Sequence, residues 1–386
     1  MLAIRPRIPN RISFYSALSM AIFLVHILTD TPKISPTFID FAIFYAAAKF
    51  AVSGQVLAVY DIDLLNKSIE FFTGYINNDI PLAWLYQPYV LLFFMPLVFL
   101  PYKYALFIWM LSGISIYLFC AYKYIDRKDL LIPLLGFPGF WYNFLWGQQS
   151  YFLTGLIGLA FYYLNKKPLL SSFLLSIALV KPHLVASCFL LLLFMRKWKV
   201  VCTTIFFYIS YIVVSLLVFP VSVWPAYKQS INWITETILL SNNLFISINL
   251  SVYNMFKFAG YENTLSLTLQ TITSCLALYI LHLCWKNQAT DITLKLSALF
   301  ITCLLTTPYT LQYDFALIGL PIIFYYNHAL RYGWIFVYEK MLLCTMWILP
   351  IISLFIVIFQ HVQITPVVLF ISLIGVYRRI NYFCNH

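Results

Sequence analysis

The sequence predicts an all-α polytopic membrane protein with about 12 transmembrane helices. Two observations predict this fold class. Apolar residues make up 62% of the 386 positions and charged residues only 10%, whereas soluble domains carry about 25% charged residues. The apolar residues also gather in runs separated by short basic segments. The chain is therefore expected to form one membrane-embedded unit over residues 1–386.

The candidate spans differ in length, and several are shorter than the ~20 residues required to cross the hydrocarbon core unaided. Short helices are possible where neighbouring protein shields their ends. The predicted runs are 12–29, 103–122, 131–147, 149–164, 168–181, 183–195, 200–219, 262–285, 293–307, 312–327, 333–358 and 363–377.

The first run is preceded by Arg5, Arg7 and Arg11 and shows no small-residue cleavage site, so we expect an uncleaved first span. No nucleic-acid motif is present, and membrane topology explains the net charge of +11. The eight cysteines include no C-x-x-C pair, which argues against both disulfides and a zinc site. We expect them to be packing residues.

Lysine and arginine positions predict the topology. The stretch 86–122 could hold one crossing or two, split at Pro96 and Pro101. Two crossings would place the basic clusters at 123–128, 166–167 and 196–199 outside, against the positive-inside rule. One crossing is therefore expected, with 86–100 as an apolar helix in the outer interface.

This topology puts both termini in the cytoplasm and leaves two long outer segments, 30–102 and 220–261. Most of the 13 acidic residues then lie outside. The polar residues that could form a functional site are therefore expected to face away from the cytoplasm.

Within the first outer loop, residues 41–52 are expected to form a short amphipathic helix that ends near Gly54. Asp40 stands just before it. Spacing alone favours an N-cap, because aspartate accepts hydrogen bonds from free amides at a helix start. A general base at the membrane surface is the functional alternative, and the two roles are compatible. The apolar face of the helix would carry Phe41, Phe44, Tyr45 and Ala48.

Three further outer positions are weaker candidates. Asp61, in a Y-D-x-D run, is typical of a turn or cap, and metal binding with Asp63 would need a third oxygen ligand. Tyr86 precedes Pro88 and fits an aromatic interface belt. Gln148, in a G-Q-Q-S turn, either caps a helical hairpin or binds sugar hydroxyls.

Lys181-Pro182-His183 lies at an outer turn between two apolar runs, with no counter-charge nearby in the sequence. A lysine at the edge of the membrane, away from the cytoplasmic side, is a functional candidate. A lipid-linked phosphate would be a natural partner for it. Snorkelling of the side chain to the interface is the alternative.

Polar residues mark two more outer segments. Asn249 and Ser251 lie in a segment of mixed polarity that is rich in asparagine. Asp314 follows a threonine- and tyrosine-rich turn at the start of a span, where a helix N-terminal role is favoured over catalysis.

Taken together, these motifs resemble glycosyltransferase family 87, the DUF2029 group of polyprenyl-phosphate-mannose-dependent mannosyltransferases. The match runs over most of the chain, and the order and spacing of short motifs carry it. The matching residues are Asp40, Phe41, Tyr45, Ala46 and Ala47; Gly54; Tyr60 and Asp61; Tyr86, Pro88, Pro96 and Pro101; Gly147 and Gln148; Lys181 and Pro182; Arg196 and Trp198; Asn249 and Ser251; Thr307 and Pro308. The family's second proline is replaced by Gln87 and its histidine by Tyr313, which bears on the choice of donor and acceptor.

The resemblance implies a GT-C-like fold with interfacial helices in the first outer loop. It also implies transfer of a hexose, mannose in the family, from a polyprenyl-phosphate donor to a glycolipid or glycan acceptor at the outer face of the bacterial inner membrane. Asp40 would be the general base, and Lys181 with His183 would bind the donor phosphate. A single displacement would invert the anomeric carbon. The substrate-binding candidates are Asp61, Tyr86, Gln148, Asn249, Ser251 and Asp314.

No metal or nucleotide-sugar site is visible in the sequence, which leaves the use of a divalent cation open. Besides membrane lipids, the expected partners are the donor and the acceptor. Two alternatives remain. A transporter or flippase of lipid-linked saccharides predicts ionisable residues at mid-membrane and an internal repeat, and no repeat is seen. A non-catalytic scaffold predicts no polar cluster confined to one face.

Overall fold

The computed structural model describes residues 16, 19–21, 37–74, 82–236, 249–286 and 291–385. Within these ranges every regular element is a helix, and a single isolated β-bridge joins Asn249 to Leu311. The predicted all-α class is therefore confirmed for the described residues. Most of the predicted first span, 12–29, lies outside them.

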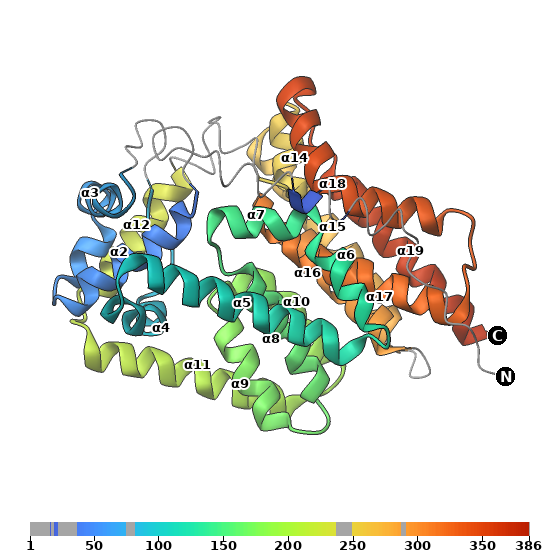
Figure 1. Ribbon diagram of the computed structural model, residues 1–386, viewed down its shortest axis with the longest axis horizontal. Coiled ribbons are helices and arrows are strands. Elements are labelled where there is room, and N and C mark those ends of the chain that lie inside the picture. Colours follow the sequence, from blue (N-terminus) through green and yellow to red (C-terminus); the bar gives the residue numbers. More distant parts are fainter. Residues whose placement is uncertain are drawn as a thin grey trace.

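A group of short helices forms one end of the molecule, on the left in Figure 1. We call it the cap group. It has an apolar core of its own, in which Phe44 packs against Trp84, Tyr86 and Phe94. The cap group consists of α2 (Ile39–Val52), η1 (Val56–Tyr60), α3 (Ile62–Thr73), η2 (Pro88–Val90), α4 (Leu91–Phe94), η3 (Met95–Phe99) and α12 (Val223–Ile234).

One prediction for this region is wrong. The helix predicted at 41–52 is α2, but it is not amphipathic, because every residue from Ile39 to Ala48 except Asp40 is buried. The apolar helix predicted at 86–100 is present as a short apolar helix over Pro88–Phe99, in which 3-10 turns (η2 and η3) flank α4. Pro88 is its first residue and Pro101 follows its end, as expected for a residue that lacks an amide donor and restricts the residue before it.

The remaining helices form a larger bundle around a second apolar core. In it α16 is central, because every residue from Thr293 to Leu305 is buried, and it packs against α15, α17 and α19. The elements of the bundle are α5 (Tyr102–Tyr124), η4 (Lys128–Leu130), α6 (Leu131–Leu135), α7 (Pro138–Trp146), α8 (Ser150–Tyr163), α9 (Pro168–Ala178), α10 (Pro182–Phe194), α11 (Trp198–Val218), α14 (Val252–Phe258), α15 (Asn263–Lys286), α16 (Ile292–Leu305), η6 (Gln312–Phe315), α17 (Ala316–Tyr332), α18 (Glu339–Gln360) and α19 (Thr365–Asn385).

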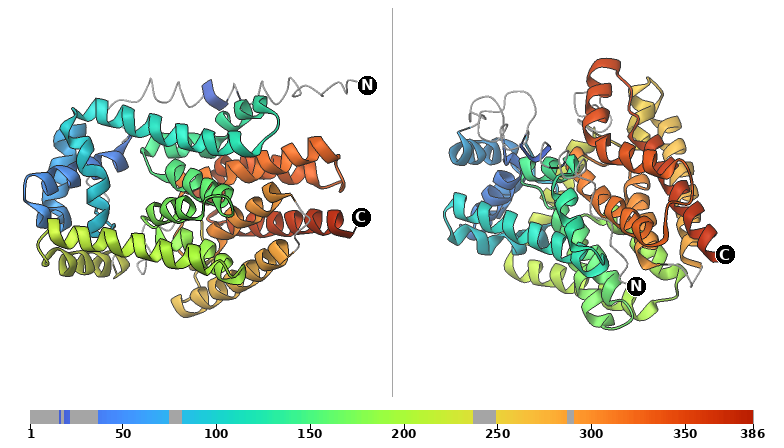
Figure 2. Two further views of the ribbon diagram at one scale, coloured as in Figure 1. Left: turned by 90° about the horizontal axis from the view of Figure 1, so that it is seen from below. Right: turned by 45° about the vertical axis from the view of Figure 1, so that its right-hand side comes forward.

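Two of these helices connect the bundle to the cap group. Figure 2 shows α5 and α11 running along the molecule from the cap group, on opposite sides of it. The side chains of Tyr208 on α11 and Gln87 beside η2 are hydrogen-bonded at 2.6 Å. This hydrogen bond helps to fix the position of the cap group relative to α11.

Five helices among the described residues are long and apolar enough to cross a membrane: α5, α11, α15, α18 and α19. These five are fewer than the about 12 spans that the sequence predicts, so that number is not confirmed. The run 131–147 is split into α6 and α7 at Gly136. Helix α8 has 14 residues, which at about 1.5 Å per residue covers roughly 21 Å, less than the ~30 Å of the hydrocarbon core.

At the end of the bundle away from the cap group, the structure brings together segments that the sequence predicts on the cytoplasmic side of the membrane. Arg331 pairs with Asp126 at 3.4 Å, and Lys197 donates to Asn165 at 2.8 Å. Nearby, Arg379 and Glu339 form a buried ion pair at 2.7 Å that no sequence pattern predicted. Buried charges require such pairing.

Candidate active site

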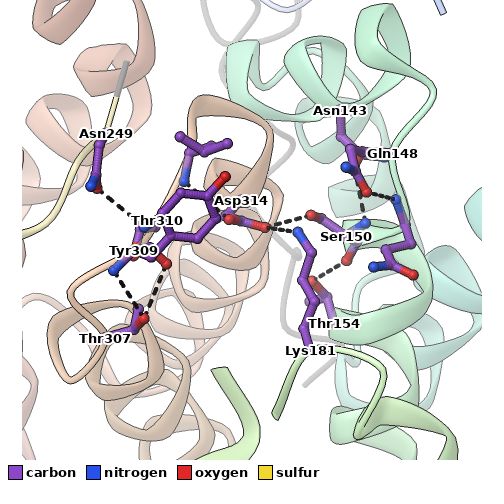
Figure 3. Close-up of polar contacts among 12 residues, drawn as sticks. Asn143, Gln148, Ser150, Thr154, Lys181, Asn249, Thr307, Tyr309, Thr310 and Asp314 are labelled. Atoms are coloured by element: carbon purple, nitrogen blue, oxygen red, sulfur yellow. Dashed lines mark hydrogen bonds and ion pairs between the residues drawn. The ribbon is translucent and has the colours of Figure 1, made fainter. Parts of the chain in front are cut away.

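Four segments far apart in the sequence meet where the bundle faces the cap group. They are the start of α2, the turn 147–150, the turn 181–183 and the loop 307–314. Figure 3 shows Gln148, Ser150 and Lys181 on one side of Asp314, and Asn249 on the other. The sequence predicts these segments on the same face, and the structure makes them neighbours.

Asp314 and Lys181 form the buried centre of this cluster. Their side chains are 2% and 5% exposed, and Lys181 Nζ lies 2.9 Å from Asp314 Oδ1. Ser150 Oγ donates to the same oxygen at 2.7 Å, and the Leu311 amide donates to Asp314 Oδ2 at 3.1 Å. The lysine ammonium also lies 4.3 Å from the centre of the Tyr313 ring. The ion pair is thus held by several hydrogen bonds.

This geometry shows what Lys181 and Asp314 contact in the folded chain. Lys181 has a counter-charge, but it comes from Asp314, 133 positions further along the chain. Asp314 is not the N-cap of η6, which is Leu311, but the third residue of that helix, and its Oδ2 accepts a hydrogen bond from the Leu311 amide. The other oxygen of the same carboxylate is shared by Lys181 and Ser150.

Asp40 is not the N-cap of α2, so that interpretation is wrong. Phe38, with a φ of 64°, occupies the cap position, and Asp40 is the second residue of the helix. The Phe38 amide donates to the Leu145 carbonyl at 2.6 Å. The end of α7 thus holds the start of α2. The Asp40 carboxyl is hydrogen-bonded to Gln148.

Gly147 allows the close approach between α2 and the 147–150 turn. Its φ is +67°, a left-handed conformation that favours glycine. A Cβ at this position would lie 2.9 Å from Phe41 Cβ. The Gly147 carbonyl accepts a hydrogen bond from the Trp109 indole at 3.0 Å. Contact between Asp40 and Gln148 depends on this tight turn.

The environment of Asp40 changes its acidity. Burial of the carboxyl raises its pKa from 3.8 to about 7, and the negative charge of Asp314 also raises it. A hydrogen bond from Gln148 and the positive charge of Lys181 act in the opposite direction. Asp40 can therefore exchange a proton near neutral pH, which is the property required of a general base.

Tyr86 is part of the site rather than of a lipid-facing aromatic belt. Gln148 Nε2 donates to its hydroxyl at 3.4 Å, so Gln148 lies between Tyr86 and Asp40. Burial, followed by the charges of Asp40 and Asp314, raises the pKa of Tyr86 well above its usual value. Its hydroxyl stays protonated and is available as a hydrogen-bond donor.

His183 and Tyr309 form an aromatic wall beside the ion pair. Their ring centres are 6.0 Å apart, in an edge-to-face arrangement. His183 is the second residue of α10 and is half-buried. The predicted phosphate-binding pair Lys181 and His183 therefore lies at one edge of the cluster, with both residues near Asp314.

Three sequence candidates have structural roles outside this cluster. Asp61 is exposed and caps α3 by accepting the Leu64 amide at 3.0 Å, which confirms the cap interpretation. Ser251 caps α14. The Asn249 side chain donates to the Pro308 carbonyl at 3.1 Å and accepts the Thr310 amide at 3.2 Å. Asn249 supports the loop that presents Asp314.

Sequence reasoning missed Ser150 and Tyr309 as site residues. Both lie inside motifs that it considered, G-Q-Q-S and T-T-P-Y, but residue type alone did not distinguish them from turn residues. Their place depends on contacts with Asp314 and His183 that only folding creates. No cluster of three or more metal-binding side chains occurs in the part of the chain that the structure describes.

Comparison with known proteins identifies the family. Searches of curated proteins and of solved structures found no match. The sequence model of glycosyltransferase family 87 matches residues 84–308, more than half of the chain. The matched region includes Gln148, Lys181 and Asn249, begins after Asp40 and ends before Asp314. The chain therefore belongs to glycosyltransferase family 87, whose members are membrane-associated glycosyltransferases.

Proposed function

We propose that this protein transfers a hexose, mannose being the family's sugar, from a polyprenyl-phosphate donor to a glycolipid or glycan acceptor. The observation that carries the proposal is the meeting, at one face of the bundle, of the Asp40 carboxyl held by Gln148 and the buried Lys181 ammonium paired with Asp314. The raised pKa of Asp40 supports it. A base and a cation are the two groups that such a transfer requires. Family membership favours an enzyme over a transporter or flippase.

In the proposed reaction, the Asp40 carboxylate accepts the proton of the attacking hydroxyl. The new bond forms between that oxygen and the anomeric carbon while the bond from the anomeric carbon to the phosphate oxygen breaks. The bonding electrons leave with the phosphate. A single displacement of this kind inverts the anomeric configuration.

Lys181 would stabilise the negative charge on the departing phosphate, with His183 beside it. Asp314 would hold the ammonium group in place when no donor is bound, since the two side chains form a direct ion pair. Gln148 would orient Asp40, and Tyr86 would offer its hydroxyl to substrate oxygens.

We further propose that the site lies on the extracytoplasmic face of the plasma membrane, with both termini in the cytoplasm. This orientation follows from the positive-inside rule. The basic segments 123–128, 166–167 and 196–199 are far from the cap group along α5 and α11, and their loops belong to the opposite end of the bundle.

The direct test is the Asp40→Asn variant, which keeps the size of the side chain but cannot accept the proton. Transfer from mannosyl-1-phosphoheptaprenol by the purified protein should fall at least 100-fold, the range typical of lost general-base catalysis. The matched control is Asp63→Asn, the same change at an exposed position of the same outer segment. It should retain normal activity, and full activity in Asp40→Asn would refute the proposed base.

Stability provides a folding check on this variant. Because the folded-state pKa of Asp40 is raised above 3.8, ionised Asp40 destabilises the fold increasingly from about pH 4 to pH 7. Asparagine lacks this penalty. Asp40→Asn should therefore unfold at a higher temperature than the wild type at pH 8, with a smaller difference at pH 5.

A further inference from the structure

The loop 333–338, which connects α17 to α18, carries aromatic side chains beside α19. It lies at the end of the bundle away from the cap group, on the right in Figure 1. Phe336 and Tyr338 are stacked, with ring centres 5.4 Å apart and an angle of 8° between the rings. Val337, between them in the chain, is fully exposed. The loop therefore presents an aromatic surface at the outside of the helix bundle.

Two exposed cations lie against these rings. The guanidinium of Arg378, on α19, lies 5.0 Å from the centre of the Phe336 ring and 5.3 Å from that of Tyr338. Lys340 Nζ lies 5.5 Å from the centre of the Trp334 ring. Within the described residues, neither cation forms an ion pair with a carboxylate. Both positive charges are therefore available to an anionic ligand.

A buried ion pair holds the loop from the inner side. Arg379, next to Arg378 in the chain, is fully buried and pairs with Glu339 at 2.7 Å. It also donates to the Gly333 carbonyl at 2.8 Å, and the other Glu339 oxygen accepts the Ile335 amide at 2.9 Å. These bonds fix the backbone of the loop. The rings and cations on its outer side are thus placed before a ligand binds, which lowers the cost of binding.

Apolar side chains continue this surface along the candidate spans. Both α18, which begins after the loop, and α19 are long and apolar enough to cross a membrane. Ile371 and Ile374 precede Arg378 on the same face of α19 and are exposed, and Met341 beside Lys340 is 70% exposed. Aromatic and basic side chains are typical of span ends at the level of lipid headgroups. A ligand here would meet cations at one end and an apolar helix face at the other.

We propose that this surface binds an anionic phospholipid in the leaflet opposite the candidate active site. Its headgroup would lie against Arg378 and Lys340, and its acyl chains along the exposed face of α19. The planar guanidinium suits the oxygens of a phosphate diester. A zwitterionic headgroup would bring a positive charge of its own to two uncompensated cations, so an anionic lipid is favoured. The inference requires α18 and α19 to span the membrane, but not the proposed reaction at Asp40.

The experiment uses the full protein in phosphatidylcholine nanodiscs that contain phosphatidylglycerol with a diazirine at the start of an acyl chain. After illumination, label should map to peptides covering 333–341 and 371–382, at least fivefold more than with the same diazirine on phosphatidylcholine. The double variant Arg378→Gln with Lys340→Gln should lose this labelling by at least fivefold, since each basic residue near an anionic surface contributes roughly that factor. Both side chains are exposed, so the variant should unfold at the wild-type temperature in phosphatidylcholine alone.

The matched control is Lys166→Gln with Lys167→Gln. It removes two exposed cations that lie over Tyr162 and Tyr163 at the same end of the bundle, and it should keep the label on 333–341. Equal losses in the two double variants would mean attraction by net charge alone and would overturn the proposal. Equal labelling by the two lipids, or label confined to other peptides, would overturn it too. Inorganic phosphate should compete no better than chloride at equal ionic strength; stronger competition would identify free phosphate, and not a lipid, as the ligand. Sugar transfer is not measured, so the outcome is independent of the proposed reaction.

Discussion

Asp40 and Gln148 show how single residues set the chemistry of the site. The carboxyl is held by a neutral amide, so its charge is not cancelled by a direct ion pair. Lys181 is kept from it by pairing with Asp314 instead. This arrangement leaves a basic carboxyl and a cation as separate groups, each able to meet a different part of the substrate.

The pH dependence of transfer should report the pKa of Asp40. Since only the ionised carboxyl accepts a proton, kcat/KM should rise with an apparent pKa of about 7 and fall tenfold per pH unit below it. In Gln148→Leu the loss of a hydrogen bond that lowers this pKa should move the rising limb to higher pH. Gln149→Leu, the same change at the next residue, should leave the limb in place. A limb that does not move in Gln148→Leu would exclude Asp40 as the titrating group.

At the scale of helices, the site depends on how α2 is placed against the end of α7. The left-handed residues Phe38 and Gly147 let the two backbones meet, and the Phe38 amide bonds to Leu145. Short helices such as α8 and α10 bring the turns at 147–150 and 181–183 to the same level as this contact. Their shortness therefore has a structural use, because neighbouring helices shield their ends.

Gly147→Ala tests the importance of that contact. The added Cβ would meet Phe41 Cβ and push α2, with Asp40, away from Gln148. Activity should fall at least tenfold. Gly54→Ala is the matched control, because its φ is +77° but no atom lies within 4 Å of the new Cβ. Both variants should lose about 1 kcal/mol of stability from backbone strain, as measured by thermal unfolding, and Gly147→Ala should lose more because of the contact with Phe41. Only Gly147→Ala should lose activity. Equal activities would mean that the α2 contact is not needed.

At the scale of the whole molecule, two apolar cores meet at the site. The bundle supplies Lys181, Ser150 and Asp314, and the cap group supplies Asp40 and Tyr86. Basic segments gather at the bundle end away from the cap group. This separation of charge suits a protein whose chemistry takes place at one membrane face.

Membrane orientation can be tested by cysteine labelling in a cysteine-free background, which is needed because Cys202, Cys275 and Cys344 are exposed. Val52→Cys, at the end of α2, should react with an impermeant maleimide in intact cells. Val337→Cys, on the fully exposed loop before α18, should react only after the membrane is opened. The reverse pattern would place the site in the cytoplasm and contradict the proposed lipid-linked donor reaction there.

Local sequence determined the membrane class, the helical elements and the segments that share a face, because hydropathy and charge patterns are read over a few turns of chain. It also indicated Asp40, Lys181 and Gln148 as candidates. Tertiary structure alone decided that Lys181 pairs with Asp314, that Asp40 meets Gln148 instead of capping its helix, and that Glu339 meets Arg379. Partners so far apart in sequence are chosen by how helices pack, and no local pattern contains that information.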